Sequence, residues 1–359
     1  MRLVATPGLG PVGARRLLAS HGTPQAVLDQ DAATLARAVP PAVAAALAAA
    51  PDPAMEALVA RTLTWREAPG HFLLALDDPA YPASLCHLHD PPLLLHVNGR
   101  LDVLARPGLA IVGARKATAQ GVRDAAAFAA AFSAAGQTVV SGLALGIDAA
   151  AHAGGLRGAG GTVAVVGTGA DIVYPASHRA LAHEVVAHGA IVTEFPLGTR
   201  AAGHHFPRRN RIIAALARGV LVVEAAERSG SLITARQAAE LGREVFAIPG
   251  SIHAPLSRGC HLLIRDGAKL VESPRDVFEE FADLAHLTGQ SDPAGGAVGG
   301  VADTAPDALG TALAYDPVTL DAICARSGKS PDTVAAALLQ LELAGAVERL
   351  PGNLFRRLG

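Results

Sequence analysis

Arginine is concentrated in one segment of the chain, where it would be able to bind phosphate. Between residues 204 and 218 there are four arginines and no acidic residue, whereas the chain as a whole carries 30 Lys plus Arg against 32 Asp plus Glu. A guanidinium group offers a rigid fork of donors that matches phosphate oxygens. Such a run is often only a solvated helix face, but its position at a loop-to-helix junction favours binding. The predicted phosphate contacts in this segment are Arg208, Arg209, Asn210 and Arg211.

Glycine-bearing turns supply the second feature with chemical potential. Three of them follow short apolar runs and precede helical stretches, and a fourth carries serines. Glycine lets backbone amides approach an anion, and a helix N-terminus adds partial positive charge. Several such turns together indicate an extended polyanion, or a nucleotide whose parts each need a binding turn. The residues predicted to contact it are Gly113, Arg115, Ser141, Gly142, Gly146, Gly167, Thr168, Gly169, Ser229, Gly230 and Ser231.

Other kinds of chemistry are less well supported by these motifs. Arg115 stands where the second glycine of a dinucleotide-binding turn belongs, and no carboxylate lies between Asp124 and Asp148 to bind a ribose, so NAD is not expected. Asp148 and His152 are four residues apart on a predicted helix, but capping and structural roles are favoured over catalysis. The histidines and cysteines match no metal-ligand spacing. We therefore predict no catalytic residue, no cofactor and no metal.

These turns need a parallel sheet to bring them together. From residue 70 to 287, brief β-branched runs alternate with glycine turns and helical stretches, which predicts an α/β fold with an extended Rossmann-like parallel sheet. In such a sheet the carboxyl ends of the strands meet at one edge, where ligands bind. The predicted strands are 109–112, 138–140, 162–166, 190–193, 220–223 and 244–248.

Three further regions flank or follow the predicted sheet. Residues 1–66 predict a helical domain of the SAM or helix-hairpin-helix kind, in which Arg15 and Arg16 would face a DNA phosphate; a plain packing module is an equal alternative. The first helix of a complete hairpin motif would need residues before Met1. Residues 288–310 predict a flexible linker because they are poor in large apolar side chains. Residues 311–359 predict a winged helix whose second helix has no Lys or Arg, which favours a protein-interaction or autoregulatory role over DNA reading.

Composition indicates the cellular compartment of the protein and the kind of nucleic-acid site it could carry. Three widely spaced cysteines, the absence of a signal-peptide pattern and the lack of about 18 consecutive apolar residues predict a cytoplasmic protein without a membrane segment. Because the charges nearly cancel, any nucleic-acid site must be a local patch. Apolar residues that follow the last predicted strand are expected to exceed the needs of the core, and they predict a dimer or partner interface at Leu263, Ile264 and Phe278.

Six linked motifs resemble one protein family. VGAR, SGLALGIDAAAH, GTGADIVYP, FPRRNRII, EAAERSGSLITA and FAIPGS, in this order, are closely similar to the DNA-processing protein A (DprA/Smf) family over about 76–287. The resemblance implies a non-enzymatic protein that binds single-stranded DNA without sequence preference and forms a homodimer. It also implies that the protein displaces or bypasses the single-strand binding protein and loads the RecA recombinase, above all during natural transformation.

The chain departs from that family pattern at a few positions. Where the family has Lys after Tyr-Pro this chain has Ala176, and where it has a nearby Asn this chain has His178. The loss of that cation is expected to be compensated by Arg179. Ala215 replaces a usual glycine, which predicts only a change in packing. The alternative function is a Rossmann-type nucleotide phosphoribohydrolase using Glu224 and Glu227, although ERSGSLIT stands in place of the PGGxGT turn of those enzymes.

Overall fold

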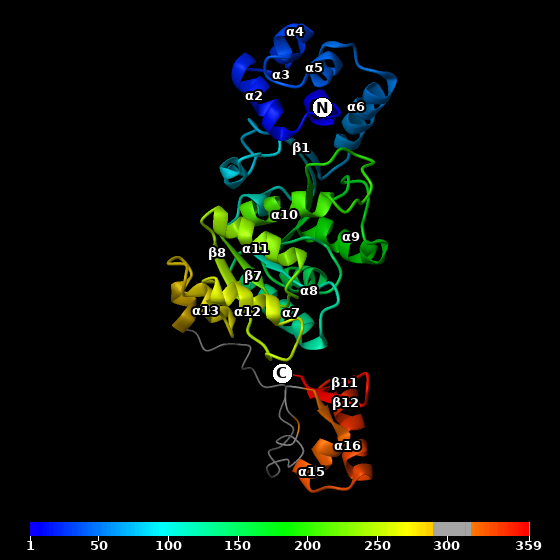
Figure 1. Ribbon diagram of the computed structural model, residues 1–359, viewed down its shortest axis with the longest axis vertical. Helices are drawn as coiled ribbons and strands as arrows, with labels where there is room; N and C mark the ends of the chain where they lie inside the picture. The colour runs from blue at the N-terminus through cyan, green and yellow to red at the C-terminus, as the bar shows by residue number, and fades with distance from the viewer. Residues whose placement is uncertain (290–312, 314–316, 359) are drawn as a thin grey trace.

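The computed structural model describes residues 1–289, 313 and 317–358. Nearly all of the predicted linker, 288–310, lies outside the described residues, and so do residues 311 and 312. Figure 1 shows the N-terminal helices at one end, the sheet in the middle and the C-terminal helices and hairpin at the other end. The boundaries of the four predicted regions remain a prediction.

A nine-stranded sheet forms the centre of the molecule, with the order β1-β2-β6-β5-β4-β3-β7-β8-β9. All neighbours from β6 to β9 in this order are parallel, which confirms the α/β fold and the six predicted strands. The strands are β1 (His71–Ala75), β2 (Leu94–Gly99), β3 (Gly108–Val112), β4 (Thr138–Ser141), β5 (Thr162–Val165), β6 (Ala190–Thr193), β7 (Gly219–Val222), β8 (Glu244–Ala247) and β9 (Lys269–Leu270).

One edge of the sheet departs from the prediction of a parallel sheet. β1 pairs antiparallel with β2, and β2 pairs antiparallel with β6. The sequence between β1 and β2 contains only the short 3-10 helix η1 (Ala83–His87). Without a crossover helix to carry the chain back, the second strand returns in the opposite direction. This antiparallel edge adds two strands that were not among the six predicted ones.

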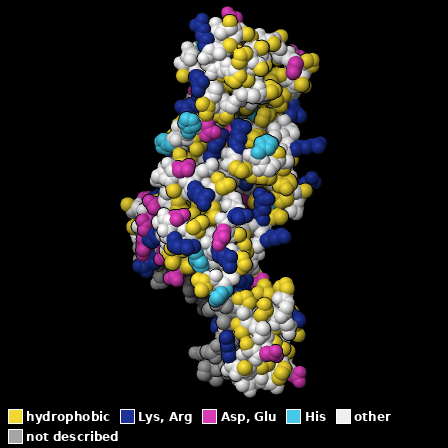
Figure 2. All heavy atoms as spheres, in the orientation of Figure 1, with side chains coloured by type: hydrophobic (Ala, Val, Ile, Leu, Met, Phe, Trp, Pro, Cys, Tyr) yellow, Lys and Arg dark blue, Asp and Glu magenta, His cyan; other side chains and the backbone are white. Residues whose placement is uncertain are grey.

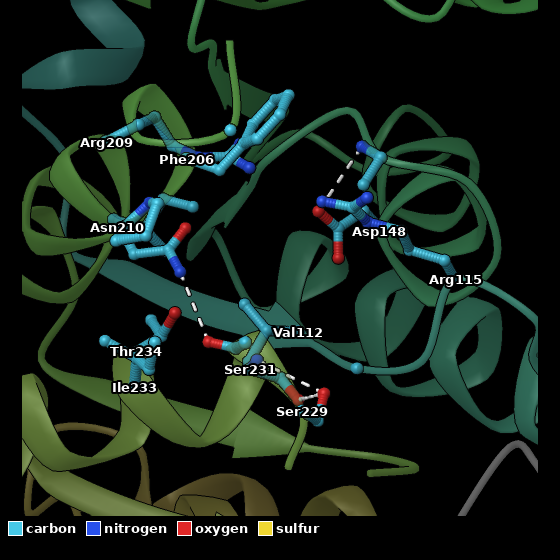
Figure 3. Close-up of a pocket in the computed structure, with 16 residues that line it drawn as sticks. Val112, Arg115, Asp148, Phe206, Arg209, Asn210, Ser229, Ser231, Ile233 and Thr234 are labelled. Atoms are coloured by element: carbon cyan, nitrogen blue, oxygen red, sulfur yellow. Dashed lines mark hydrogen bonds between the residues drawn. The ribbon is translucent and has the colours of Figure 1, made fainter. Parts of the chain in front are cut away.

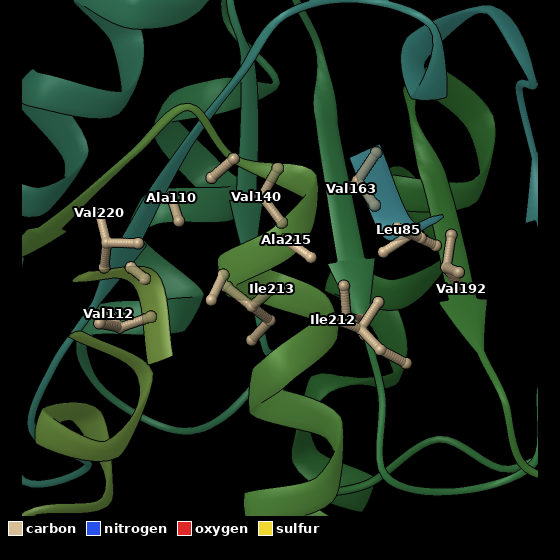
Figure 4. Close-up of a cluster of buried hydrophobic side chains, with 14 of the residues drawn as sticks. Leu85, Ala110, Val112, Val140, Val163, Val192, Ile212, Ile213, Ala215 and Val220 are labelled. Carbon is tan, nitrogen blue, oxygen red and sulfur yellow. The ribbon is translucent and has the colours of Figure 1, made fainter. Parts of the chain in front are cut away.

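Helices cover both faces of the sheet, because successive side chains along each strand point alternately into two hydrophobic cores. Ala110 and Val112 of β3 lie on the side of Ile213 in one cluster (Figure 4), whereas Ile111 packs with Phe132 on the opposite face. The first face carries α10 (His205–Leu216), α11 (Gly230–Glu240) and α12 (Arg258–Arg265), and the second carries α7 (Ala119–Ala134), α8 (Ile147–Gly155), α9 (Arg179–His188) and α13 (Pro274–Phe278). The remaining 3-10 helices are η2 (Asp102–Leu104), η3 (Ala176–His178) and η4 (Ala285–Gly289).

The first 66 residues form short helices with a core of their own, built around Leu17, Leu35 and Leu47. Arg15 donates to the carbonyl of His89 and Arg16 to that of Ala38, so both predicted phosphate contacts serve packing instead. This use favours the plain packing module over a DNA-binding hairpin. The helices are α1 (Arg2–Ala5), α2 (Pro11–His21), α3 (Pro24–Leu28), α4 (Ala32–Leu35), α5 (Pro41–Ala48) and α6 (Pro53–Arg66).

Among the described residues no single helix has the length and apolarity needed to cross a membrane, and one bent pair, α5 with α6, passes by length and composition alone.

At the other end of the chain, two helices and a hairpin pack around Ile323, Val334 and Leu338, which confirms the predicted winged helix. Its elements are β10 (Val318–Thr319), α15 (Leu320–Ser327), α16 (Pro331–Leu343), β11 (Val347–Leu350) and β12 (Leu354–Arg357), and its strand order is β10-β12-β11.

Two of the three apolar residues expected to form an interface lie in the interior instead. Leu263 is buried in the core on one face of the sheet and Phe278 in the core on the other, while Ile264 is half-buried. The expectation of apolar residues left over by the core is thus wrong for Leu263 and Phe278. The eight-residue amphipathic α12 places Leu263 in one core, and α13 places Phe278 in the other, so the two cores cover more of this apolar surface than the sequence pattern suggested.

Two buried histidines make the stability of the fold dependent on pH. His152 Nδ1 lies 2.7 Å from Thr162 Oγ1 and its Nε2 accepts from the amide of Leu143, whereas neither ring nitrogen of His96 has a hydrogen-bond partner. Burial lowers the pKa of His152 to about 3 and that of His96 to about 4. Both histidines are therefore neutral in the folded protein.

We expect the free energy of unfolding to fall as the pH is lowered from 7 to 5. The unfolded chain takes up a proton on each histidine near pH 6.5, while the folded chain does not, so each group costs up to about 1.4 kcal/mol per pH unit below that value. Urea unfolding at a series of pH values measures the slope. His96→Phe, which keeps the site filled, is expected to reduce the slope by about one proton; an unchanged slope would contradict the assignment.

Candidate nucleic-acid interface

A cleft of about 420 Å³ opens at the carboxyl edge of the sheet, between the ends of β3 and β7. The strand order reverses at this point, because the chain proceeds from β3 to β4 on one side and returns to β7 on the other. Open α/β sheets bind ligands at such a position. The cleft, shown in Figure 3, is lined by Val112, Gly113, Arg115, Ala144, Asp148, Gly203, Phe206, Pro207, Arg209, Asn210, Ile213, Ser229, Gly230, Ser231, Ile233 and Thr234.

The turn after β3 brings an unpaired guanidinium to the cleft. A Cβ atom on Gly113 would lie 2.7 Å from Cγ1 of Ile147, so only glycine allows this close approach of the turn to α8. Arg115 is exposed, and its guanidinium carbon lies 5.2 Å from the centre of the Phe206 ring. Within the described part of the chain Arg115 makes no hydrogen bond or ion pair. Its donors are free for an anionic ligand.

The arginine-rich segment is helical, and its side chains point to opposite sides of α10. Positions 206, 209, 210 and 213 share one face of a helix with 3.6 residues per turn, and all four line the cleft. Arg208 and Arg211 lie on the other face, where both pair with the buried carboxylate of Glu194 at 2.8 and 2.6 Å. Arg211 also pairs with Asp90 at 3.2 Å. The structure thus separates these two arginines from the cleft.

The side chain of Arg209 is buried at the base of the cleft. Its Nη1 donates to the carbonyl oxygens of Gly142 and Val165 at 2.6 and 2.5 Å. A Cβ atom on Gly142 would lie only 1.9 Å from this nitrogen, so the glycine makes room for the guanidinium. Burial lowers the pKa of Arg209 to about 10. The side chain lines the cleft while it ties the ends of β4 and β5 together.

Asp148 stabilises the turn after β4 through hydrogen bonds to its backbone. Its Oδ2 accepts hydrogen bonds from the amides of Gly142 and Ala144 at 3.1 and 3.4 Å. Burial raises the pKa of this carboxyl group, while the positive charge of Arg209 acts in the opposite direction. Asp148 therefore supports the loop that faces the ligand, in keeping with a structural role rather than catalysis.

The N-terminus of α11 forms the opposite wall of the cleft. Ser229 caps the helix by accepting from the amide of Ser231 at 3.3 Å, and the two hydroxyl groups lie 2.6 Å apart. Asn210 Nδ2 donates to the carbonyl of Gly230 at 3.3 Å, which joins α10 to this turn. A Cβ atom on Gly230 would meet nothing within 4 Å, so the turn is open to a ligand. A helix N-terminus of this length favours an anion.

A smaller pocket of about 50 Å³ adjoins the cleft across Arg115 and Arg209. Predicted residues Gly142, Gly167 and Thr168 line it, together with Tyr174 and Phe206, whose ring centres are 5.9 Å apart. The Thr168 hydroxyl donates to the carbonyl of Ile172 and therefore serves the turn itself. The pocket thus offers aromatic surface beside the two guanidinium groups.

Besides Arg208 and Arg211, four predicted contacts lie outside both hollows. The buried hydroxyl of Ser141 donates to the carbonyl of Ile111, and Gly146 makes room for the carbonyl of Ala114. The amide of Gly169 donates to Thr199, and Arg179 is exposed at the start of α9. Sequence reasoning did not assign Phe206, Tyr174, Ile213, Ile233 or Thr234 to the site, although helical spacing within the FPRRN run would have paired position 206 with 209.

Neither of the two glutamates that the alternative hydrolase would use faces the cleft. Glu224 accepts from the backbone amide and the hydroxyl of Thr118 at 2.9 and 2.5 Å, where it stabilises the start of α7. Its carboxylate also occupies the space that a side chain on Gly121 would fill. Glu227 is exposed and does not line the cleft. Within the described residues no group of three or more His, Cys, Asp or Glu side chains is placed to hold a metal ion.

Comparisons with known proteins agree with the geometry. The family model for DNA recombination-mediator protein A matches residues 72–282, and the model for the DprA winged helix domain matches residues 300–353. Protein Smf of Escherichia coli is 41% identical over 305 residues, which cover 82% of this chain and 80% of that protein. DNA processing protein DprA of Streptococcus pneumoniae is 48% identical over 206 residues, covering 57% and 72% of the two chains.

Two solved structures share the fold. The X-ray structure of DNA processing protein A from Streptococcus pneumoniae matches with a TM-score of 0.68 and 37% identity, covering 77% of this chain and 95% of that one. A structure describing the single-stranded DNA binding mode of the Helicobacter pylori protein matches with a TM-score of 0.53 and 25% identity, covering 60% and 95%. The chain therefore belongs to the DNA recombination-mediator protein A (DprA/Smf) family.

Proposed function

We propose that this protein binds single-stranded DNA without sequence preference and acts in the cytoplasm as a recombination mediator rather than as an enzyme. The observation that carries the proposal is the cleft between β3 and β7, where the unpaired Arg115 faces the N-terminus of α11. Guanidinium groups and backbone amides bind phosphate oxygens, which are the same in every nucleotide. The Helicobacter pylori relative, described as binding single-stranded DNA, supports the same assignment.

The distribution of charged side chains over the surface supports a local DNA-binding site rather than an extended basic surface. Figure 2 shows basic and acidic side chains interspersed over the face in view, without one continuous basic surface. A strand would therefore be bound by the few cations of the cleft and by the rings of Phe206 and Tyr174, on which bases are able to stack irrespective of their identity. Duplex DNA cannot offer unstacked bases to these rings, so single strands are expected to bind more tightly.

A salt series that compares single-stranded with double-stranded DNA of equal length tests the proposal. We expect tighter binding of the single strand at every salt concentration, with little difference between oligo-dT and mixed sequences. The logarithm of the binding constant is expected to fall with the logarithm of the salt concentration by roughly 0.7 for each phosphate contact. Equal affinity for the two forms, or strong dependence on sequence, would reject the proposed function.

The mediator role adds protein partners to the proposal. The DNA-bound protein would displace or bypass the single-strand binding protein and load the RecA recombinase during natural transformation. A homodimer is part of the same proposal, with the half-buried Ile264 and Leu270, which is 44% exposed, as candidate contacts. Light scattering at micromolar concentration is expected to give twice the monomer mass; a strict monomer with and without an oligonucleotide would remove the dimer from the proposal.

The phosphoribohydrolase alternative is disfavoured by the position of Glu224. Its carboxylate is held by Thr118 at the start of α7 and is not presented to the cleft. Incubation with adenosine monophosphate is therefore expected to release no free adenine. Release of the base at a rate that depends on Glu224 would favour the hydrolase instead.

A further inference from the structure

A second cleft lies at the opposite edge of the sheet, at the amino ends of the strands. Its volume is about 480 Å³, larger than that of the cleft between β3 and β7. Three arginines line it and no acidic residue does. The lining residues are Pro79, Ala80, Tyr81, Pro82, Ala83, Ser84, Leu104, Ala105, Arg106, Pro107, Gly108, Leu216, Ala217, Arg218 and Arg243. We call this hollow the amino-edge cleft.

Two of its arginines are held by neighbouring carboxylates. Arg106 pairs with Asp102 at 2.6 Å, and Arg218 pairs with Asp283 while its guanidinium carbon lies 3.9 Å from the centre of the Phe281 ring. Both side chains are thereby fixed in position. They add positive charge to the walls, but most of their donors are already used.

Arg243 is the arginine with unused donors. In the described part of the structure its one side-chain hydrogen-bond partner is Nδ1 of His87, at 3.4 Å, and its Nε is buried without any partner. The buried Nε is out of reach of a ligand, but the Nη atoms, whose one partner is His87, would be able to donate to an anion in the cleft. The walls of the cleft carry excess positive charge. Asp102 is shared by Arg100 and Arg106, so one of these two charges is not balanced, and Arg243 adds another.

Helix α11 connects the two clefts. It begins at Gly230, in the cleft between β3 and β7, and ends at Glu240, three residues before Arg243. Its 11 residues span about 16 Å, a distance that a few nucleotides of an extended strand would bridge. Arg236 is exposed midway along the helix and offers a further cation between the two ends.

We propose that the amino-edge cleft is a second phosphate site, in which Arg243 binds the backbone of a DNA strand that leaves the first cleft along α11. This inference rests on the proposed binding of single-stranded DNA. The group that the amino-edge cleft binds is a phosphate oxyanion. A DNA strand that is too long to end in the first cleft supplies this group. The site lengthens the footprint of each protomer without adding any base reading.

The experiment compares Arg243→Ala with wild type on two oligonucleotides, dT3, which is too short to span both clefts, and dT40. The variant is expected to weaken dT40 binding roughly fivefold, to reduce its salt slope by about one contact, and to leave dT3 binding unchanged. Arg243→Lys is expected to retain most of the dT40 affinity. Arg157→Ala removes an exposed arginine beyond the end of α8 and is the matched control, with no effect on either oligonucleotide.

Several outcomes would overturn the inference. One is an equal loss on dT3 and dT40, and another is no loss on either in an Arg243→Glu protein that melts like wild type. If inorganic phosphate or an oligoglutamate peptide binds in an Arg243-dependent way while dT40 affinity is unchanged, the occupant is a free anion or an acidic protein segment and not the strand. If the wild-type protein fails to bind dT3 and dT40 at all, the proposed function fails first.

Discussion

Replacing Arg115 with alanine is expected to weaken binding of oligo-dT by roughly ten- to a hundredfold. The guanidinium is unpaired in the free protein, so its donors are available to a phosphate without any internal bond being broken. A hydrogen bond to a charged group contributes about 1.5 to 3 kcal/mol, and each 1.4 kcal/mol is a factor of ten in affinity. Mixed-sequence strands are expected to lose the same factor. Fluorescence anisotropy with labelled oligonucleotides measures the change.

Lys116→Ala is the matched control for Arg115. It removes the same charge from the next position of the same turn, but Lys116 is exposed and does not line the cleft. A much smaller loss than that of Arg115→Ala is expected. Equal losses would mean that only the general positive field matters, and undiminished affinity in a folded Arg115→Ala protein would count against the cleft as the DNA site.

Arg209→Ala is expected to lower the free energy of unfolding by about 3 to 5 kcal/mol. The change removes the hydrogen bonds that Arg209 donates to the carbonyls of Gly142 and Val165, and it removes the stronger of the two positive charges, Arg209 and Arg115, that act on the buried Asp148. The loss of two buried hydrogen bonds from a charged donor, together with the loss of a favourable charge beside a buried carboxylate, has a cost of this size. Because the loop after β4 would relax, DNA affinity is expected to fall as well. Urea unfolding followed by circular dichroism gives the stability change.

Arg208→Ala is the corresponding control on the same helix. Arg208 is 43% exposed, and Glu194 keeps its second partner, Arg211, when the first is removed. The expected loss of stability is within about 1 kcal/mol, as for a partly exposed ion pair. If Arg208→Ala proved as destabilising as Arg209→Ala, the assignment of the two faces of α10 would be incorrect.

Periodicity in the sequence predicted most of the sheet. The parallel strands are short runs of buried β-branched residues bounded by glycine turns, and that pattern placed six of them within one or two residues. The edge formed by β1 and β2 was not predicted, because their connection contains only η1 instead of a long helix. The two-residue β9 is too short to give a pattern. Interface predictions at Leu263 and Phe278 were wrong since sequence alone does not show how much apolar surface the core will cover.

The site was predicted in outline but not side chain by side chain. The turns that supply Gly113, Arg115 and the 229–231 segment do meet in one cleft, as the carboxyl ends of parallel strands must. Treating the arginines of α10 as one cluster ignored the 100° rotation between successive helical residues, which turns Arg208 and Arg211 away. Their partner, Glu194, is far from them in sequence, so only the folded structure reveals the ion pairs.

The central position of β3 bears on how the chain is made by the ribosome. β3 is buried along its whole length, yet β7, which pairs with one of its sides, is synthesised more than a hundred residues later. At about 5 to 20 residues per second, the nascent chain carries an open apolar strand edge for roughly 5 to 20 seconds. Such an edge is a template for aggregation. Fragments that stop before Gly219 should therefore depend on chaperones for solubility, whereas fragments that include β7 and β8 should not.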